Sequence, residues 1–472
     1  GKLTDDIEIN AALTDENSPI QPEGNTEKLQ ELDKVFIEIK SNNVIGTIGD
    51  INVDFTNNEF LNFKRKIQGA KGFADYKSGN IFLSGAVQRG LFSTNQFNGK
   101  DEIQGPYYLV GANNEINILI LSGTEKVYLD GNPMTRGEQA DYTIDYGIGT
   151  ITFTNNRLIT SDSRIIVDFE YTDRRYSRAI LSGANTLNLF RNKLRLTASY
   201  VNQDDNQDKP IDFTLTEQDK QILENAGDDR FKAVKSGVVY VGTDTAGIGL
   251  GLYEKSDTII NKVSYPYYKY LPNDSNAVYQ VVFSFVGQGN GNYIQQSQFQ
   301  YNYVGLSQGN FDTVVFIPVP NAHQVADLNL NYESSPRKEL TFNVESALSV
   351  FDANKFSPLG DNNNNGVAVL ATLGLNRYNF NLFGLKLNTV ELKLKEKLVN
   401  RVYLPLERYN PVEFYREYDI QDTNKLTEDL HEISLRVIPT RNIDFKGSFG
   451  QLLRGDVFNS LRTVGEIAVR ND

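Results

Sequence analysis

The chain has 472 residues, of which 39% are hydrophobic and 23% charged, and its net charge is −13. This acidic balance argues against nucleic acid as a partner, because nucleic-acid binding needs basic surface. Cysteine is absent, which excludes a disulfide framework, a thiolate nucleophile and a zinc–thiolate site. No apolar run approaches the ~20 residues of a membrane helix, whereas strands that cross a membrane show only alternation of apolar and polar residues.

Residues 1–104 contain stretches in which apolar and polar residues alternate, the pattern of a β-strand with two different faces. We expect N-terminal barrel strands here, at Asp6–Leu13, Asp33–Lys40, Ile45–Phe55, Phe63–Tyr76 and Asn80–Gly90. The links between these strands are long, short, medium and short in turn.

A long excursion over 105–173 follows, and its pattern predicts a separately folded insert. Short apolar stretches at Thr124–Gly131, Asp141–Thr154 and Ser163–Tyr171 are separated by turn-forming residues such as Asn155 and Asn156. Several short strands broken by turns indicate a small β-sandwich of its own.

Barrel strands resume over 174–202, and a second insert is expected over 203–323. Thr216 is placed to cap a helix, Asp219 occupies the capping-box position, and Gly227 is suited to end the helix. Strands follow, with a near-repeat in which Phe285–Tyr293 (FVGQGNGNY) resembles Tyr303–Phe311 (YVGLSQGNF). From this repeat we expect two similar hairpin arms.

The last segment, 324–472, carries two-faced C-terminal barrel strands such as Ala326–Glu333. The charged residues on the polar faces have mixed sign: Asp327, Glu333, Glu345, Lys393, Lys395, Lys397, Arg436, Asp444 and Lys446. In a membrane barrel this face lines a wet lumen and the apolar face meets lipid. In a soluble sandwich the polar face meets water and the apolar face forms the core.

The lengths of the links favour the barrel. Short links at Phe190–Lys193, Ser334–Lys338, Asn381–Gly384 and Pro439–Asn442 alternate with excursions at Gln203–His323, Asp352–Asn365, Val399–Asp429 and Arg454–Asn459. Short turns on one side and long loops on the other are typical of outer-membrane barrels. We therefore predict an all-β fold, an antiparallel transmembrane β-barrel of about 14 strands or part of a larger one, with inserted small β-domains.

Four motifs, VYLDGNPMTRGEQADYTIDYGIGTITFT, SRIIVDFEY, LTEQDKQILENAGDD and VFDANKFSPLGDNNNNG, resemble a family of large, mostly uncharacterised outer-membrane β-barrel surface proteins of Gram-negative bacteria. The resemblance spans most of the chain and rests on loop and turn signatures. It implies an exported barrel with inserted β-domains, and it implies no reaction and no ligand. The chain departs from the general barrel pattern at Ala468–Asp472, where an aromatic last residue is usual.

Catalytic motifs are missing from the sequence. It contains no nucleophile elbow, P-loop or HExxH motif, and its two histidines, His323 and His431, stand at the beginnings of predicted strands. Structural roles at strand edges are the common use of such residues. We therefore expect that the protein is not an enzyme.

The best metal candidate is an Asn- and Asp-rich loop in which Asp352, Asn354, Asp361 and Asn363 offer oxygen ligands that suit calcium. Their spacing differs from that of an EF-hand loop, and Asn and Asp also dominate solvated turns. A calcium site at these four residues is carried as a hypothesis, and no other cofactor is indicated.

Together these observations predict a protein of the cell outer membrane that acts in transport, secretion or surface display, with long extracellular loops that form a cap or plug. Its expected partners are the lipid bilayer, other outer-membrane or surface proteins, and a glycan or protein ligand at Tyr-rich loops near Tyr265–Tyr270 and Tyr403–Tyr418. The alternative is a secreted soluble multi-domain β adhesin or filament subunit. A polysaccharide-acting enzyme would need two carboxylates held ~5–10 Å apart, and no motif suggests one.

Overall fold

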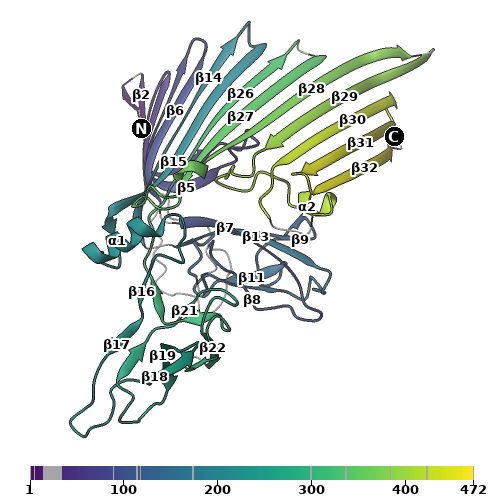
Figure 1. Cartoon of the computed structure of the whole chain (residues 1–472). Helices are drawn as coiled ribbons and strands as arrows, with labels where there is room; N and C mark the ends of the chain where they lie inside the picture. Colours follow the sequence, from purple (N-terminus) through teal and green to yellow (C-terminus); the bar gives the residue numbers. More distant parts are fainter. Residues whose placement is uncertain are drawn as a thin grey trace. The chain divides into compact units, whose positions relative to one another are not determined.

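The computed structural model describes residues 2–4, 6–13, 35–88, 90–112, 115–116, 118–172, 175–297, 300–334, 337–382, 384–420 and 424–470. The chain is all-β and is built on one antiparallel sheet of 15 strands (Figure 1), in the order β1-β2-β3-β4-β5-β6-β14-β15-β26-β27-β28-β29-β30-β31-β32. The predicted all-β fold on a long antiparallel sheet is confirmed. Among the described residues, no pairing joins β32 to β1.

The N-terminal part of the sheet contains β1 (Lys2–Thr4), β2 (Ile7–Leu13), β3 (Val35–Ser41), β4 (Val44–Asp54), β5 (Lys64–Tyr76) and β6 (Gly79–Gln88). The five predicted strands correspond to β2–β6, with ends shifted by two residues at most. The additional strand is β1, which is too short to show alternation. It accounts for the difference between the expected 14 strands and the observed 15.

The C-terminal part contains β14 (Tyr176–Leu189), β15 (Leu194–Pro210), β26 (Ala322–Glu333), β27 (Leu340–Asp352), β28 (Asn365–Leu382), β29 (Leu385–Val399), β30 (Glu428–Thr440), β31 (Ile443–Arg454) and β32 (Phe458–Val469). The short and long links alternate as predicted. Strand β15 runs past the expected end at 202, because Arg178 on β14 pairs with Asp205 at 2.7 Å and extends the ladder.

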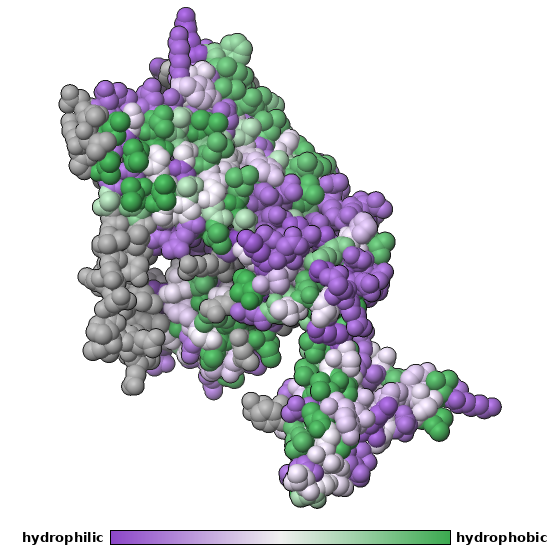
Figure 2. Space-filling view, turned by 90° about the vertical axis from the view of Figure 1, so that its left-hand side faces the viewer, coloured by the Kyte–Doolittle hydropathy of each residue, from purple (hydrophilic) through white to green (hydrophobic). Residues whose placement is uncertain are grey.

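The two faces of the sheet differ in what covers them. All nine charged residues predicted for the lumen lie on one face, hereafter the inner face, as the strand registers and the hydrogen bond from Asn329 on β26 to Glu345 on β27 show. The opposite, outer face carries apolar side chains that stay exposed, including Leu83 at 58%, Leu181 at 55% and Leu398 at 48%. Figure 2 shows hydrophobic residues gathered over the sheet. A sandwich would bury this face, so the sandwich alternative does not describe the sheet.

The first insert forms two small sheets packed on a common core. One sheet contains β7 (Gly90–Asn98), β9 (Lys126–Leu129), β10 (Asn132–Pro133) and β13 (Arg164–Thr172), and the other contains β8 (Tyr107–Tyr108), β11 (Tyr142–Asp145) and β12 (Thr150–Phe153). Leu109, Ile151 and Phe169 are among its fully buried residues. The insert begins at β7 rather than at 105, because β7 pairs with β13 along its whole length.

A second compact unit contains residues 212–321 and 352–361. It begins with α1 (Glu217–Ala226), whose capping box between Thr216 and Asp219 is present, and which ends at Gly227 as predicted. Its strands are β16 (Val234–Ser236), β17 (Val238–Tyr240), β18 (Tyr253–Ile260), β19 (Val263–Tyr270), β20 (Tyr279–Val281), β21 (Ser284–Phe285), β22 (Tyr293–Ser297), β23 (Gln300–Tyr303), β24 (Phe311–Asp312) and β25 (Val314–Phe316).

The near-repeat in this unit forms one structure instead of two hairpin arms. Phe285 pairs with Phe311, and Tyr293 pairs with Tyr303, so the first copy runs antiparallel to the second within one sheet. Gly291 and Gly309 form a bridge between the copies. The expectation of two separate arms was therefore wrong, because each copy supplies the pairing partner of the other.

Among the described residues, no helix has the length and apolar character needed to cross a membrane.

Candidate functional site: two loops on the inner face of the sheet

The link between β4 and β5, residues 55–63, folds onto the inner face of the sheet. Its side chains Phe60, Leu61 and Phe63 are fully buried. The backbone nitrogen of Phe60 donates a hydrogen bond to Glu345 Oε1 on β27, at 2.7 Å. Strands β5, β6, β14, β15 and β26 separate β4 from β27 in the sheet, so this loop crosses the inner face.

Ion pairs fix the loop to β29. Glu59 Oε1 lies 3.0 Å from Lys397 Nζ and 3.2 Å from Lys395 Nζ, and the Lys397 side chain is only 2% exposed. Burial raises the pKa of Glu59, but the two lysines outweigh burial, so this pKa lies below its usual value. The loop therefore carries a carboxylate that stays charged and compensates buried cations.

The link between β29 and β30, residues 400–427, occupies the same face. Lys397 Nζ also donates to Asn410 Oδ1 at 2.7 Å, and the Tyr403 hydroxyl donates to the carbonyl oxygen of Phe60 at 3.1 Å. The Phe60 ring lies 5.8 Å from the Tyr403 ring and 6.0 Å from the Tyr409 ring, centre to centre. The two loops thus pack on each other through an aromatic cluster.

A short helix in the second loop adds contacts at the C-terminal strands. Helix α2 (Phe414–Glu417) buries Phe414, and Tyr418 directly after it donates to Glu432 Oε1 at 2.8 Å. Arg462 on β32 lies 3.1 Å from Glu417. Through these contacts the second loop also packs against β32, the last strand of the sheet.

The small sandwich over β7–β13 is linked to β5 and to the second loop through charged side chains. Arg65 at the start of β5 is 1% exposed and lies 3.3 Å from Glu170 on β13 and 3.3 Å from Glu407 in the second loop. Burial raises the pKa of Glu407, and Arg65 offsets this only in part. Arg408 pairs with Asp168 on β13, and this bond raises the pKa of Arg408 although burial opposes it.

The unit of the large sheet contains several cavities, of which two bear on the inner face. One, of about 640 Å³, lies between the second loop and the sandwich, and its lining includes Phe92, Ile166 and Tyr415. Another, of about 490 Å³, lies on the inner face near the short turns and is lined by charged side chains such as Lys393, Arg436 and Glu466. The two loops thus cover the inner face at its long-loop end, where a cavity remains beside the sandwich, and the second cavity lies toward the short turns.

The sequence predicted the inner charges but did not predict the loops that meet them. Over residues 56–62 its pattern indicated only a link of medium length. The sequence signal was present in Phe60, Leu61 and Phe63, since apolar residues are unusual in an exposed loop. The Tyr403–Tyr418 segment was expected to offer tyrosines to a ligand, but Tyr403 is 5% and Tyr418 1% exposed, so both are buried against the sheet.

Two of the four residues of the predicted calcium loop are described by their own surroundings. Asn354 is fully buried, and its Nδ2 donates to the carbonyl oxygens of Leu223 and Gly227 at 2.8 and 2.7 Å, so it caps the end of α1. Asn363 ends the short 3-10 helix Asp361–Asn363 and belongs to the unit of the large sheet.

Carboxylates of the same loop meet a third one from the end of α1. Burial raises the pKa of Asp228, and the carboxylate of Asp361 raises it further. Asp352 interacts with both of these groups. The carboxylates of Asp228, Asp352 and Asp361 therefore influence one another electrostatically.

The two histidines differ in their surroundings. His323 on β26 is 8% exposed, and its Nε2 lies 2.9 Å from the carbonyl oxygen of Leu404 in the second loop. His431 lies on β30 with a carboxylate on each side. His323 thus has a structural contact, as expected for a strand beginning.

One family model matches a segment of the chain. Residues 92–173 match a family described as Domain of unknown function (DUF8818), and this segment coincides with the small sandwich. A search of curated proteins found no match.

Three solved structures illustrate what the chain is similar to. OpdQ of Pseudomonas aeruginosa is 9% identical, with 92% of this chain and 78% of that chain covered and a TM-score of 0.24. OprB of Pseudomonas putida is 8% identical, with 93% of this chain and 72% of that chain covered and a TM-score of 0.31. OmpT, an outer membrane protein of Vibrio cholerae, is 10% identical, with 92% of this chain and 93% of that chain covered and a TM-score of 0.23. Because these identities are so low, the function of this chain has to be inferred from its own residues.

Proposed function

We propose that this chain is an outer-membrane β-barrel protein that acts in transport and whose interior is closed at rest by two loops. The observation that carries the proposal is the contrast between the faces of the sheet. The outer face exposes apolar residues over many strands, a surface that lipid would cover. The inner face carries charges, and loops held by buried ion pairs fill it.

The arrangement of the links supports a closure at one end. The links 55–63 and 400–427 and the sandwich over β7–β13 all leave the sheet on the side of the long loops. If this side is extracellular, the closure faces the exterior. Transport then requires the two loops to leave the inner face, and breaking the bonds around Glu59 and Arg65 would open the path.

Membrane residence is tested first. The purified chain is expected to remain folded only in detergent or lipid and to migrate differently in a gel before and after heating. A secreted adhesin or filament subunit, the alternative, would stay folded and monomeric in buffer and accumulate in the culture medium. That second outcome would end the membrane proposal.

Closure is tested separately by conductance in planar bilayers. The parent chain should conduct little, and a variant in which residues 56–62 are replaced by an equally long Gly-Ser link should conduct strongly. As a control, the same kind of replacement at Lys77 and Ser78, the short link between β5 and β6, should leave the conductance low. Equal conductance of the parent and the 56–62 variant would refute closure by this loop.

A calcium site at the Asn- and Asp-rich loop remains part of the proposal. Its candidate ligands are Asp352 and Asp361 together with Asp228, which interacts with both, whereas the side-chain nitrogen of Asn354 is engaged at the end of α1. Terbium luminescence in competition with calcium would test this site. Binding that persists in Asp352→Asn combined with Asp361→Asn would exclude it.

A ligand-binding role for the tyrosines over Tyr265–Tyr270 on β19 is also proposed. Some of these rings are committed to internal packing, since Tyr267 stacks on Tyr303 with 4.5 Å between ring centres. Tyr265 is half-buried, and the part of its ring that stays at the surface is available to a glycan or protein surface. A glycan array probed with the parent chain and with Tyr265→Ser tests this role, and identical or absent signals would remove it.

A further inference from the structure

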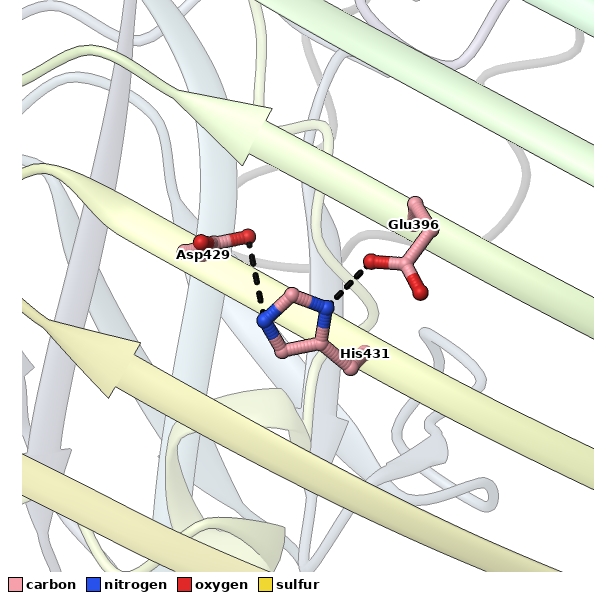
Figure 3. A group of neighbouring side chains, drawn as sticks. All are labelled: Glu396, Asp429 and His431. Carbon is pink, nitrogen blue, oxygen red and sulfur yellow. Dashed lines mark hydrogen bonds and ion pairs between the residues drawn. The ribbon is translucent and has the colours of Figure 1, made fainter.

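Three ionisable side chains meet on the outer face, on the strands β29 and β30. Glu396 on β29 is the register partner of His431 on β30, and Asp429 precedes His431 by two residues, so all three point to the same side. Figure 3 shows the imidazole between the two carboxylates. His431 Nε2 lies 3.5 Å from Asp429 Oδ1, and Nδ1 contacts Glu396 Oε2.

This cluster interrupts an apolar surface. The neighbouring residues on the same face of β29 and β30 are Leu394, Leu398 and Ile433, all of which are exposed. Placing two carboxylates side by side is unfavourable unless a positive charge compensates them. The alternation that makes the rest of this face apolar is thus broken at adjoining positions on two strands, which brings three potential ligands together.

The geometry suits a metal ion. One potential ligand atom from each of the three residues lies within 4.8 Å of the other two, and each residue sits on a paired strand that limits its movement. Two carboxylate oxygens and one imidazole nitrogen form a ligand set used by zinc and related divalent ions. The charges of the two carboxylates would balance the two positive charges of the ion.

We propose that Glu396, Asp429 and His431 form a binding site for a divalent transition-metal ion, with zinc as the representative. Only one ring nitrogen can bind the ion, and the other can donate to a carboxylate oxygen that does not, which would orient the ring. Three protein ligands leave a fourth position for water or for an oxygen of another molecule. The proposal does not depend on the proposed transport function, because it concerns the outer face alone.

The composition allows a metal test that is specific for one residue. The chain has no cysteine and two histidines, and the second histidine, His323, is buried against the carbonyl oxygen of Leu404. Nitrogen coordination of an added metal ion therefore reports on His431. The probe is zinc chloride in calorimetry of the whole purified chain, and copper(II) in electron paramagnetic resonance, where a bound imidazole nitrogen is visible.

We expect one equivalent of zinc to bind the parent and the affinity to fall by more than about 100-fold in His431→Gln, since loss of an orienting partner alone costs about 10–100-fold. Glu396→Gln and Asp429→Asn should each weaken binding. The matched control is Glu466→Gln, an inner-face carboxylate paired with Lys446 at 3.4 Å, which should bind zinc like the parent.

Two results would overturn the proposal. One is the absence of stoichiometric zinc binding by the folded parent. The other is binding of equal strength in the parent and in His431→Gln, which would assign the ion to carboxylates elsewhere. The copper spectrum guards against variants that fail to fold, because a folded parent that shows only oxygen coordination also refutes the site.

Discussion

Replacing Glu59 by Gln should loosen the loop over 55–63 without disturbing the sheet. The substitution leaves Lys397, whose side chain is 2% exposed, without its anionic partner. Removing one partner of a fully buried ion pair costs about 3–5 kcal/mol. Because the Glu59 side chain is 24% exposed and solvent screens part of the interaction, and because Asn410 still accepts from Lys397, we expect about 2 kcal/mol.

The absence of cysteine allows this effect to be measured at the loop itself. Leu61 is fully buried, so Leu61→Cys introduces a single thiol that reacts with a maleimide only when the loop opens. A loss of about 2 kcal/mol from the opening free energy corresponds to roughly 30-fold faster labelling, since each 1.4 kcal/mol is tenfold. Labelling is compared between Leu61→Cys alone and Leu61→Cys with Glu59→Gln.

The control is Glu391→Gln in the same background. Glu391 is also an inner-face carboxylate and lies 3.4 Å from Arg436, but it does not contact the loop. It should leave the labelling rate within about twofold, because an exposed pair contributes ~0–1 kcal/mol. Equal labelling of the parent background and the Glu59→Gln variant would refute the idea that this ion pair holds the loop.

Three further predictions concern other parts of the chain. Asn354→Ala should destabilise the α1 unit by about 2–3 kcal/mol, because two carbonyl oxygens lose their hydrogen-bond donor. Asn225→Ala on the exposed side of α1 is the control and should have little effect. Hydrogen exchange of the α1 amides measures both variants, and equal protection in the two would contradict the reasoning. Leu181→Arg on the outer face should lower the free energy of unfolding in lipid vesicles by about 2–4 kcal/mol. Leu359→Arg, at a residue that is equally exposed at 55%, is the control and should leave this free energy unchanged. A similar free energy of unfolding for both variants would argue against lipid contact at Leu181. Because the folded-state pKa of Glu59 lies below 4.5, its contribution to stability should be complete above pH 4.5 and lost as the pH falls through the lowered value. The melting temperature of the parent should therefore fall more steeply below pH 4.5 than that of Glu59→Gln. Parallel curves of melting temperature against pH would contradict this.

The strands and their faces could be predicted from the sequence because both depend on local alternation. Lys393, Lys395 and Lys397 share a face simply because their spacing is two residues. The helix over Glu217–Ala226 was predicted for a similar reason, since capping residues act within one turn. Strand β1 was missed because three residues are too few to show a period.

The packing of the two loops on the inner face could not be predicted because its contacts are not local. Nothing in the sequence around Phe60 specifies that its backbone nitrogen meets Glu345, and nothing near Arg65 indicates both Glu170 and Glu407 as partners. These contacts depend on how far the sheet curls. The same limit applies to the cluster of Glu396, Asp429 and His431, which needs the register between two strands joined by a long loop.

The separation of these contacts along the chain has a consequence for assembly. Phe60 and Glu345 are 285 positions apart, and Asn62 and Arg408, which also bond, are 346 positions apart. Contacts between such distant residues form late, because ordering the intervening chain costs entropy before the contact is made. The loop over 55–63 can therefore find its partners only after β27 and β29 have joined the sheet. During folding the inner face therefore stays uncovered by this loop until the last third of the chain is in place, and the packed loop indicates that β27 and β29 have joined the sheet in the right register.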